Sequence, residues 1–280
     1  MTDPALSGQV QASDGIPDWP TFARTHEWRR AQAAASLRRA DPAITAAITA
    51  LSSFQEDVRA KRYPAARRAL SAYAAHLQDA KAAGAGQGAL LLSLAAPESL
   101  EAGLAALEQV QSYPEPAELE GAVAPALAHP LTRAEALNAQ GVLRALREEP
   151  DLARADFERA LEADPQHYRA RMNLGNLALE SGDPKQAETQ YREVLKLAPD
   201  YDGAHHNLGV ALRRQGKLQA SVGAIRRAQR LGARRMQQEA KDDVQEQLRV
   251  NPRLRLIRNI VLGVVALVVL LVLLQSQGKL

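Results

Sequence analysis

The chain has 280 residues, of which 46% are hydrophobic and only 4% aromatic, and it carries a net charge of +3 with no cysteine. The absence of cysteine excludes disulfides, thiolate metal sites and cysteine nucleophiles. Ala, Leu, Arg, Glu and Gln dominate the composition. Because these residues are strong helix formers, the composition predicts an all-α protein.

The small net charge hides three blocks along the chain. Residues 20–70 carry a net charge of +6, residues 71–165 carry −9 and residues 166–259 carry +8. The acidic and basic surfaces are therefore separated in sequence, and the second basic block directly precedes a hydrophobic C-terminal stretch.

Residues 1–18 are rich in Asp, Gly, Pro and Ser, and we expect them to be disordered. They have no basic start followed by an apolar run, so they do not resemble a secretory signal. We therefore expect the bulk of the chain to stay in the compartment where it is made.

Residues 19–133 predict a helical domain divided by proline and glycine. Asp41 and Pro42 supply an N-cap and a first-turn proline for a helix that ends near residue 62. Tyr63 and Pro64 start the next helix, which we expect to end near residue 83. Two shorter helices are expected at residues 98–112 and 117–128.

The second half of the chain contains an internal repeat of 34 residues. We expect its glycines to lie where two helices of a unit cross closely, its large side chains to fill the core of the unit, and its prolines to end the second helix. Glu188, three residues before one of the large side chains, is expected on the surface. The matched sets are Gly141, Gly175 and Gly209; Ala153, Ala187 and Ser221; Phe157, Tyr191 and Ile225; Ala160, Val194 and Ala228; and Pro165, Pro199 and Ala233.

This pattern resembles the tetratricopeptide repeat, a 34-residue unit of two antiparallel helices. The resemblance implies an all-α, right-handed solenoid of helical hairpins with an N-terminal helical extension. Three repeats are expected over residues 134–233, at 134–167, 168–201 and 202–233. The first unit departs from the pattern, because Gln140 stands where the others have leucine.

Weaker patterns flank the three repeats. Residues 63–70 have the spacing of a repeat's second helix, and residues 100–107 have it one unit later. Residues 19–133 are therefore either degenerate repeats or unrelated helical hairpins. After the repeats, an apolar residue at every fourth position predicts a capping helix over residues 234–250. That stripe consists of Met236, Ala240, Val244 and Leu248.

Residues 260–274 are uninterrupted apolar, and with their flanks they predict one transmembrane helix over residues 256–275. The apolar run alone spans about 22 Å, so flanking leucines and snorkelling arginines would have to complete the span. The alternative is a buried core helix, which the length permits. Three arginines precede the run and only Lys279 follows it. The positive-inside rule then predicts a single-pass C-terminal tail anchor, with the bulk of the chain in the cytoplasm.

The resemblance also implies a binding surface, because tetratricopeptide arrays hold peptides or helices along a concave groove lined by their first helices. Asparagine amides there could pair with a peptide backbone, and arginines favour an acidic or carboxylate-bearing ligand. The alternative is that the asparagines only brace neighbouring helices. A clamp for C-terminal carboxylates, found in one subfamily, is not expected, because only Asn173 fits it. Carried over by register, the groove contains Asn138, Arg169, Asn173, Asn176, His206, Asn207 and Arg213.

Eight cations without an acid lie between residues 213 and 235. We expect this run to be attracted to anionic lipid headgroups, because it precedes the predicted anchor. An ordinary solvated helix surface is the alternative. The residues expected to contact the membrane surface are Arg226, Arg227, Arg230, Arg234, Arg235, Arg253, Arg255 and Arg258.

A second basic group lies near the N-terminus, and it defines an alternative function. A membrane-tethered regulator could contact nucleic acid through these basic N-terminal helices, with nearby aromatic rings stacking on bases. We do not expect nucleic acid to be the main partner, because so few rings are present. The basic residues are Arg24, Arg29, Arg30, Arg38 and Arg39, and the rings are those of Trp19, Phe22 and Trp28.

No motif in the sequence indicates catalysis, a metal or a cofactor. His205 and His206 are adjacent, and on a helix their side chains diverge by about 100°. The glycines at residues 84–88 follow no predicted strand, which favours a linker over a nucleotide-binding loop. We therefore expect a non-enzymatic protein-interaction scaffold or adaptor at the cytoplasmic face of a membrane. The sequence identifies neither the protein partner nor the oligomeric state.

Overall fold

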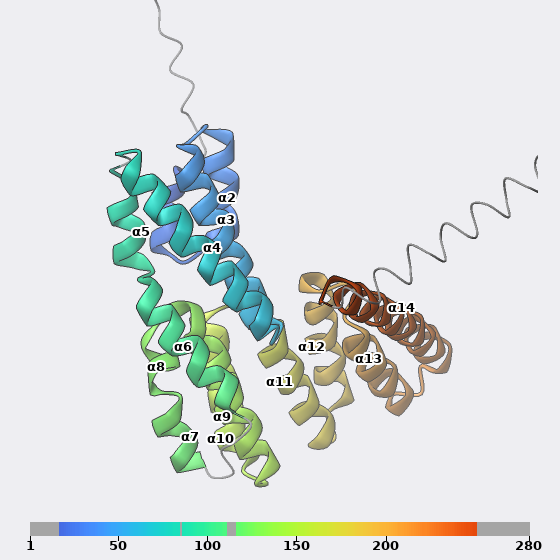
Figure 1. The fold of residues 1–280 in the computed structure, drawn as a ribbon. Coiled ribbons are helices and arrows are strands. Elements are labelled where there is room, and N and C mark those ends of the chain that lie inside the picture. The colour runs from blue at the N-terminus through green and yellow to red at the C-terminus, as the bar shows by residue number, and fades with distance from the viewer. Residues whose placement is uncertain (1–16, 85, 111–115, 251–280) are drawn as a thin grey trace, which may run out of the picture. The chain divides into compact units, whose positions relative to one another are not determined.

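The computed structural model describes residues 17–84, 86–110 and 116–250, and every regular element within those ranges is an α-helix (Figure 1). The all-α class is therefore confirmed for the part of the chain that is described. The chain divides into two compact units, Met1–Pro199 and Asp200–Leu280. Most of the predicted disordered segment 1–18 and all of the predicted span 256–275 lie outside the described residues.

Eight helices of the first unit precede the repeats. Proline stands in the first turn of most of them, where its fixed φ suits a helix start. The Asp41 side chain accepts hydrogen bonds from the backbone N–H groups of Ala43 and Ile44, which confirms the predicted N-cap. The helices are α1 (Trp19–Arg24), α2 (Trp28–Leu37), α3 (Pro42–Arg59), α4 (Tyr63–Ala82), α5 (Gly88–Leu94), α6 (Pro97–Gln109), α7 (Pro116–Ala122) and α8 (Ala124–Ala128).

These helices share one continuous hydrophobic core, in which Trp28, Phe54 and Tyr73 are fully buried. The Tyr73 hydroxyl donates to the backbone oxygens of Leu91, at 3.1 Å, and Ala95, at 2.8 Å. The Leu91 oxygen also accepts from the backbone N–H of Ala95, so it is the Ala95 carbonyl, just past the end of α5, that depends on this hydroxyl. Burial raises the pKa of Tyr73, so the hydroxyl stays a donor at neutral pH.

Within the described residues, the stretch Gly88–Gln109 is long and apolar enough to cross a membrane, judged by length and composition alone. The helix breaks at Ala95 and Ala96, between α5 and α6. Leucines on both sides of the break, including Leu91 and Leu104, lie in the core described above. The apolar character of this stretch is thus used in packing.

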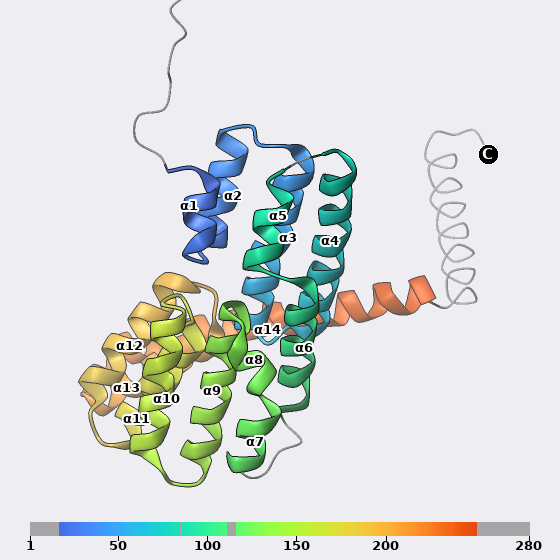
Figure 2. The ribbon, with the colours of Figure 1, turned by 90° about the vertical axis from the view of Figure 1, so that its left-hand side faces the viewer.

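The first two repeats follow in the same unit as α9 (Pro130–Leu146), α10 (Pro150–Ala163), α11 (Tyr168–Glu180) and α12 (Pro184–Leu197). Figure 2 shows α9 beside α8 and α10. A Cβ atom added to Gly141 would lie 2.6 Å from Phe157 Cε1, and one added to Gly175 would lie 2.6 Å from Tyr191 Cε1. Both aromatic rings are buried. The predicted close crossing of the two helices is therefore confirmed in both repeats.

The second unit contains α13 (Asp202–Arg214) and α14 (Leu218–Val250). A Cβ atom on Gly209 would lie 2.6 Å from Ile225 Cγ1, so the third repeat has the same close crossing. Ser221 occupies the place of the small alanines, and its buried hydroxyl donates to the backbone oxygen of Gly209 at 2.7 Å. That bond satisfies the polar atom that serine adds to the core.

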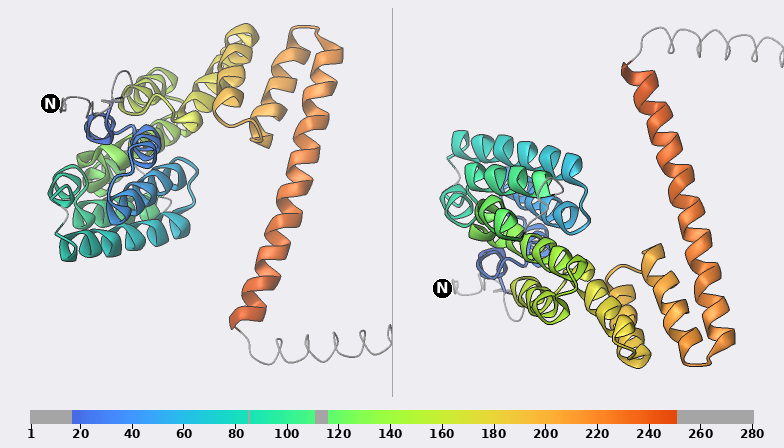
Figure 3. Two further views of the ribbon diagram at one scale, coloured as in Figure 1. Left: turned by 90° about the horizontal axis from the view of Figure 1, so that it is seen from above. Right: turned by 90° about the horizontal axis from the view of Figure 1, so that it is seen from below.

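The predicted capping helix over residues 234–250 is not a separate helix. Figure 3 shows α14 as one unbroken helix, and it runs for 33 residues. The helices α10 and α12 end just before Pro165 and Pro199, whereas the third unit has Ala233 at that place, so nothing stops the helix. Met236, expected in a packed stripe, is 68% exposed.

Candidate functional site

The first helices of the first two repeats border a small hollow of about 170 Å³. Its lining is mostly apolar, with two amides and one carboxylate. Leu146, at the C-terminal end of α9, is 77% exposed. Such an exposed leucine beside a hollow is available to a ligand. The lining residues are Val142, Ala145, Leu146, Phe157, Asn173, Asn176, Leu177 and Glu180.

Asn138 does not line this hollow, although the sequence predicted that it would face the binding groove. It is fully buried, and its amide is used inside the protein. Its Nδ2 donates to Glu135 Oε2 at 3.3 Å, and its Oδ1 accepts from Asn173 Nδ2 at 2.8 Å. Asn138 therefore braces α9 against α11 and cannot contact a ligand while this packing persists.

Glu135, one turn before Asn138, is the centre of a buried polar cluster. Its Oε1 lies 3.5 Å from Lys61 Nζ and accepts from the Tyr63 hydroxyl at 3.4 Å. Its Oε2 lies 3.0 Å from Nε2 of His167, whose side chain is 1% exposed. Burial, followed by the charge of Glu135, raises the pKa of Tyr63. One carboxylate thus joins the N-terminal helices to both repeats of the first unit.

The other expected groove residues of the first unit are accessible only in part. Asn173 and Asn176 line the hollow and are half-buried. Asn176 Oδ1 accepts from the Tyr191 hydroxyl at 2.9 Å, so part of this amide positions the core ring of its own repeat. Arg169 is half-buried at the start of α11 and does not line the hollow.

The expected groove residues of the second unit lie on α13. His206 and Arg213 are exposed and Asn207 is half-buried. Their accessibility agrees with a role at a surface, and their assignment to a binding groove stays a prediction.

Sequence reasoning missed the buried charges that join distant parts of the first unit. Arg59, at the end of α3, makes a bidentate ion pair with Asp164. Its Nε donates to Oδ2 at 2.5 Å and its Nη2 donates to Oδ1 at 2.9 Å. Both side chains are largely buried. Only Glu135 gave a local signal, because it lies one helical turn before Asn138. Nothing local in the sequence pairs residue 59 with residue 164.

Glu188 is not the surface residue expected from its distance to Tyr191. It is 4% exposed, and its Oε1 lies 2.5 Å from Arg192 Nη1 one turn later. Tyr191 itself is fully buried, as predicted. Residues three apart on a helix lie close to the same face, so the carboxylate is drawn under the guanidinium beside the core.

The arginines of α14 fall into two groups. Arg227 pairs with Asp200 at 3.1 Å and Arg235 pairs with Asp202 at 2.8 Å, so these two help to hold α14 to the start of α13. The other three, Arg226, Arg230 and Arg234, are exposed, four residues apart, and have no ion pair within the described residues. They form one line of like charge along the helix. Arg253, Arg255 and Arg258 lie outside the described residues.

The aromatic residues proposed to stack on nucleic acid bases are not available for that role. Trp19 is 3% exposed and Trp28 is fully buried in the core. Phe22 is half-buried with the Arg30 guanidinium 5.8 Å from its ring centre, and Arg30 also pairs with Glu27. The N-terminal basic group therefore lacks the stacking partners that the alternative function required.

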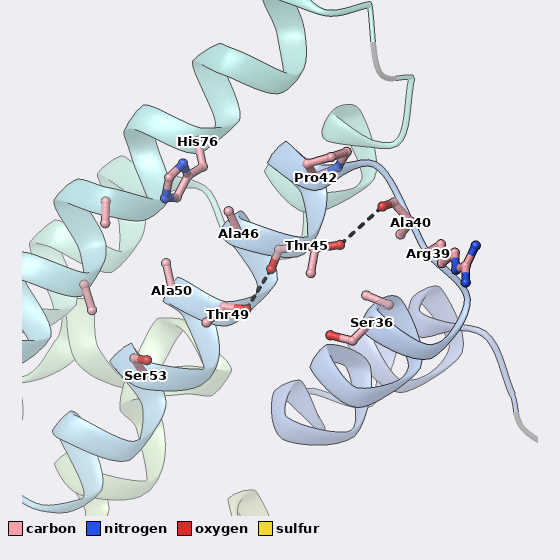
Figure 4. Close-up of a pocket in the computed structure, with 13 residues that line it drawn as sticks. Ser36, Arg39, Ala40, Pro42, Thr45, Ala46, Thr49, Ala50, Ser53 and His76 are labelled. Carbon is pink, nitrogen blue, oxygen red and sulfur yellow. Dashed lines mark hydrogen bonds between the residues drawn. The ribbon is translucent and has the colours of Figure 1, made fainter.

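A larger and more open groove, of about 620 Å³, lies among α2, α3 and α4 (Figure 4). Alanine, serine and threonine dominate its lining. Thr49 Oγ1 donates to the backbone oxygen of Thr45 at 2.8 Å, and Thr45 Oγ1 donates to that of Ala40 at 3.5 Å. These hydroxyls are thus used locally. Among the residues described, no group of three or more His, Asp or Glu side chains is placed to hold a metal ion.

Comparisons with known proteins address the repeats directly. A family model described as tetratricopeptide repeat matches residues 138–201 and residues 172–235. Among solved structures, the chain is similar to MamA, with 18% identity, a TM-score of 0.36, and coverage of 69% of this chain and 94% of MamA. It is also similar to BtubC from P. vanneervenii, with 17% identity, a TM-score of 0.40, and coverage of 69% of this chain and 92% of BtubC.

These structural likenesses are too distant to say more about the chain, and no curated protein matches it. The family match stands on its own, because it covers the same residues in which Gly141, Gly175 and Gly209 pack against a large side chain. Residues 138–235 match the tetratricopeptide-repeat model, and they form a helical scaffold of the kind that binds other proteins.

Proposed function

We propose that the chain is a membrane-tethered adaptor that binds a segment of a partner protein on the first helices of its repeats. The observation that carries this proposal is the hollow between α9 and α11, in which Leu146 is 77% exposed beside Val142 and Leu177. Its volume of about 170 Å³ suits one large aliphatic side chain or one aromatic side chain. The partner would insert such an anchor residue.

The charge around this hollow does not favour an acidic anchor residue, although the sequence predicted an acidic ligand. Its one charged lining residue is Glu180, so the anchor itself is uncharged or stands next to a basic residue. Arg169 and Arg213 could still attract acidic residues elsewhere in the partner. An acidic partner segment stays a prediction from those two arginines.

The binding proposal can be tested with peptides selected from a phage-displayed library on the full-length chain in detergent micelles. We expect Leu146→Glu to weaken the selected peptides at least about tenfold, because a charge replaces the exposed apolar contact. Leu152→Glu is the matched control: Leu152 is 51% exposed on α10 and does not line the hollow. Equal loss in both variants, or none in either, would place binding elsewhere.

We further propose that residues 256–275 tether the chain to a membrane with its bulk in the cytoplasm, because residues 260–274 are uninterrupted apolar and arginines precede them. Full-length protein should sediment with membranes and resist carbonate extraction. Deletion of residues 257–280 should release it. Full-length protein that stays soluble without detergent would show that this stretch is a core or partner helix.

The line of Arg226, Arg230 and Arg234 is proposed to face anionic headgroups. The chain has no cysteine, so Gln237→Cys, at an exposed position of α14 three residues after Arg234 and on the same face, provides a unique labelling site. In nanodiscs, a label there should be shielded from an aqueous quencher when phosphatidylserine is present. Replacing the three arginines with glutamine, or raising the salt concentration, should remove that shielding. Shielding that is the same in pure phosphatidylcholine would contradict the electrostatic contact.

A further inference from the structure

The cluster around Glu135 determines how the groove amide of Asn173 is oriented. Asn173 lines the hollow, but its Nδ2 points to the buried Asn138 and donates to Asn138 Oδ1 at 2.8 Å. Within the described part of the chain, Asn173 Oδ1 accepts no hydrogen bond. The polar atom that Asn173 can offer to a ligand is therefore an acceptor.

The orientation follows from the chemistry of each group in turn. The backbone N–H of Ala170 donates to His167 Nδ1 at 3.1 Å, so in the neutral ring Nε2 carries the proton, and Nε2 lies 3.0 Å from Glu135 Oε2. A carboxylate only accepts, so Asn138 must turn its Nδ2 toward that oxygen. The Asn138 Oδ1 then faces Asn173, which must donate a hydrogen bond to it from its own Nδ2.

Burial makes this order of donors and acceptors costly to reverse. Glu135 is 1% exposed and Asn138 is fully buried. Rotating the Asn138 amide would set its oxygen against the carboxylate and its NH₂ against that of Asn173, leaving buried groups unpaired. Tyr63 and Lys61 approach the other oxygen of Glu135, so the N-terminal helices hold the carboxylate in place.

We propose that Glu135, acting through Asn138, is a positioning residue that presents the Asn173 oxygen to the groove, so that the groove recognises a backbone N–H next to an apolar anchor side chain. The occupant is thus an extended peptide segment with a free N–H beside its anchor. This inference rests on the proposed binding function, since it names the ligand group that the same hollow would read.

The ligand test uses the tightest peptide from the phage selection above and its series of single backbone N-methylations. One N-methylation should weaken binding to the wild-type chain about three- to tenfold, the range for one hydrogen bond. The same N-methylation should cost at most about twofold in Asn173→Ala and in Asn138→Leu. Leu146→Glu would lower the affinity of every peptide without changing the ratio between them. Peptides that bind without any N-methylation coupled to Asn173 would overturn the inference and leave the binding function standing.

A second measurement needs no ligand and keeps the two proposals separable. In nuclear magnetic resonance spectra of chain labelled with ¹⁵N-asparagine, the Asn173 side-chain NH₂ should exchange with water at least about tenfold more slowly than an exposed amide. That protection should be lost in Asn138→Leu and in Glu135→Leu. It should persist in Glu188→Gln, which changes a similarly buried carboxylate on α12. An unprotected Asn173 amide in the wild-type chain would refute the orientation whether or not a peptide binds.

Discussion

The first and second repeats, both in the first unit, share one packing frame, the close contact of a glycine with an aromatic ring, but differ in the side chains around it. Both pack an aromatic ring 2.6 Å from the place where a glycine Cβ would lie. In the second repeat the side chain of Met172, three residues before Gly175, is a buried apolar neighbour, whereas in the first Asn138, also three residues before its glycine, is bonded to Glu135. The glycine–ring contact is thus independent of what surrounds it.

This difference shows that the apolar contact forms the helical hairpin, whereas the polar contacts determine which element packs beside it. The apolar contact builds a helical hairpin that any neighbouring hairpin can extend, because it is non-directional. The polar cluster is directional, so it selects one neighbour, the helices that bring Lys61 and Tyr63. The first repeat is therefore specialised for its junction with the N-terminal helices.

The largest expected effect tests the shared frame. Tyr191→Ala should reduce the free energy of unfolding by about 3–5 kcal/mol, because it leaves a cavity at a fully buried site. Phe157→Ala should have a similar effect in the first repeat. Chemical unfolding followed by circular dichroism measures both. A loss under about 1 kcal/mol at either position would mean that the two rings do not play equivalent roles.

The second prediction tests the polar junction. Glu135→Ala should cost about 3 kcal/mol, since Asn138 and Tyr63 lose a buried acceptor and the buried His167 loses the carboxylate beside it. Glu188→Ala should cost only about 1 kcal/mol, because its partner Arg192 is 60% exposed and can be solvated. Comparable losses in the two variants, measured by the same unfolding experiment, would remove the distinction between junction and ordinary repeat.

The sequence predicted the frame of both repeats but not the junction. The 34-residue step located Gly175 and Tyr191 correctly, because a repeat restates the same local packing three times. Glu135 with Lys61, and Arg59 with Asp164, were out of reach, since each pairs residues that are far apart in sequence and occurs once. The same limit affected the site: register placed Asn138 in the groove, and only the buried carboxylate beside it explains why it turns inward.

A third prediction concerns the closeness of the helix crossing. Gly175→Ala should cost about 1–3 kcal/mol, because its Cβ would lie 2.6 Å from Tyr191 Cε1 and that ring cannot shift while its hydroxyl is bonded to Asn176. Gly203→Ala, at which the nearest atom would be 3.5 Å away, is the control and should change stability by less than about 0.5 kcal/mol. A neutral Gly175→Ala would show that the crossing can widen.

Acid should weaken the N-cap of α9, which is the side chain of His129. His129 Nδ1 accepts from the N–H of Leu131, and burial lowers the pKa of His129 to about 4, with His26 and Arg133 nearby adding in the same direction. An unfolded histidine titrates near 6.5, so the stabilising effect is complete above about pH 6.5 and is lost as the pH falls toward 4. His129→Asn keeps a capping acceptor without titrating there. Unfolding measured from pH 7 to pH 4 should be less pH-dependent in that variant, and an unchanged dependence would exclude His129 as its source.

The smallest expected effect lies at the turn between the two helices of each repeat. Gly182 occupies it in the second repeat with φ +83°, whereas Glu148 occupies it in the first with φ +62°. A left-handed conformation strains a residue that has a Cβ, so Glu148→Gly should stabilise the chain by up to about 1 kcal/mol after the entropy of the added glycine. Thermal unfolding can measure this, and a destabilised variant would assign a local role to the Glu148 side chain.

The unbroken course of α14 has a mechanical consequence. At 1.5 Å per residue its 33 residues extend for about 50 Å. Its buried contacts with α13 include Ser221, Ala228 and Leu231, and beyond the pair of Arg235 with Asp202 the described side chains are exposed. The remaining turns act as a stiff lever arm. A pull or a twist applied at Val250 would reach the third repeat with little damping, and a proline at residue 233 would disconnect the two.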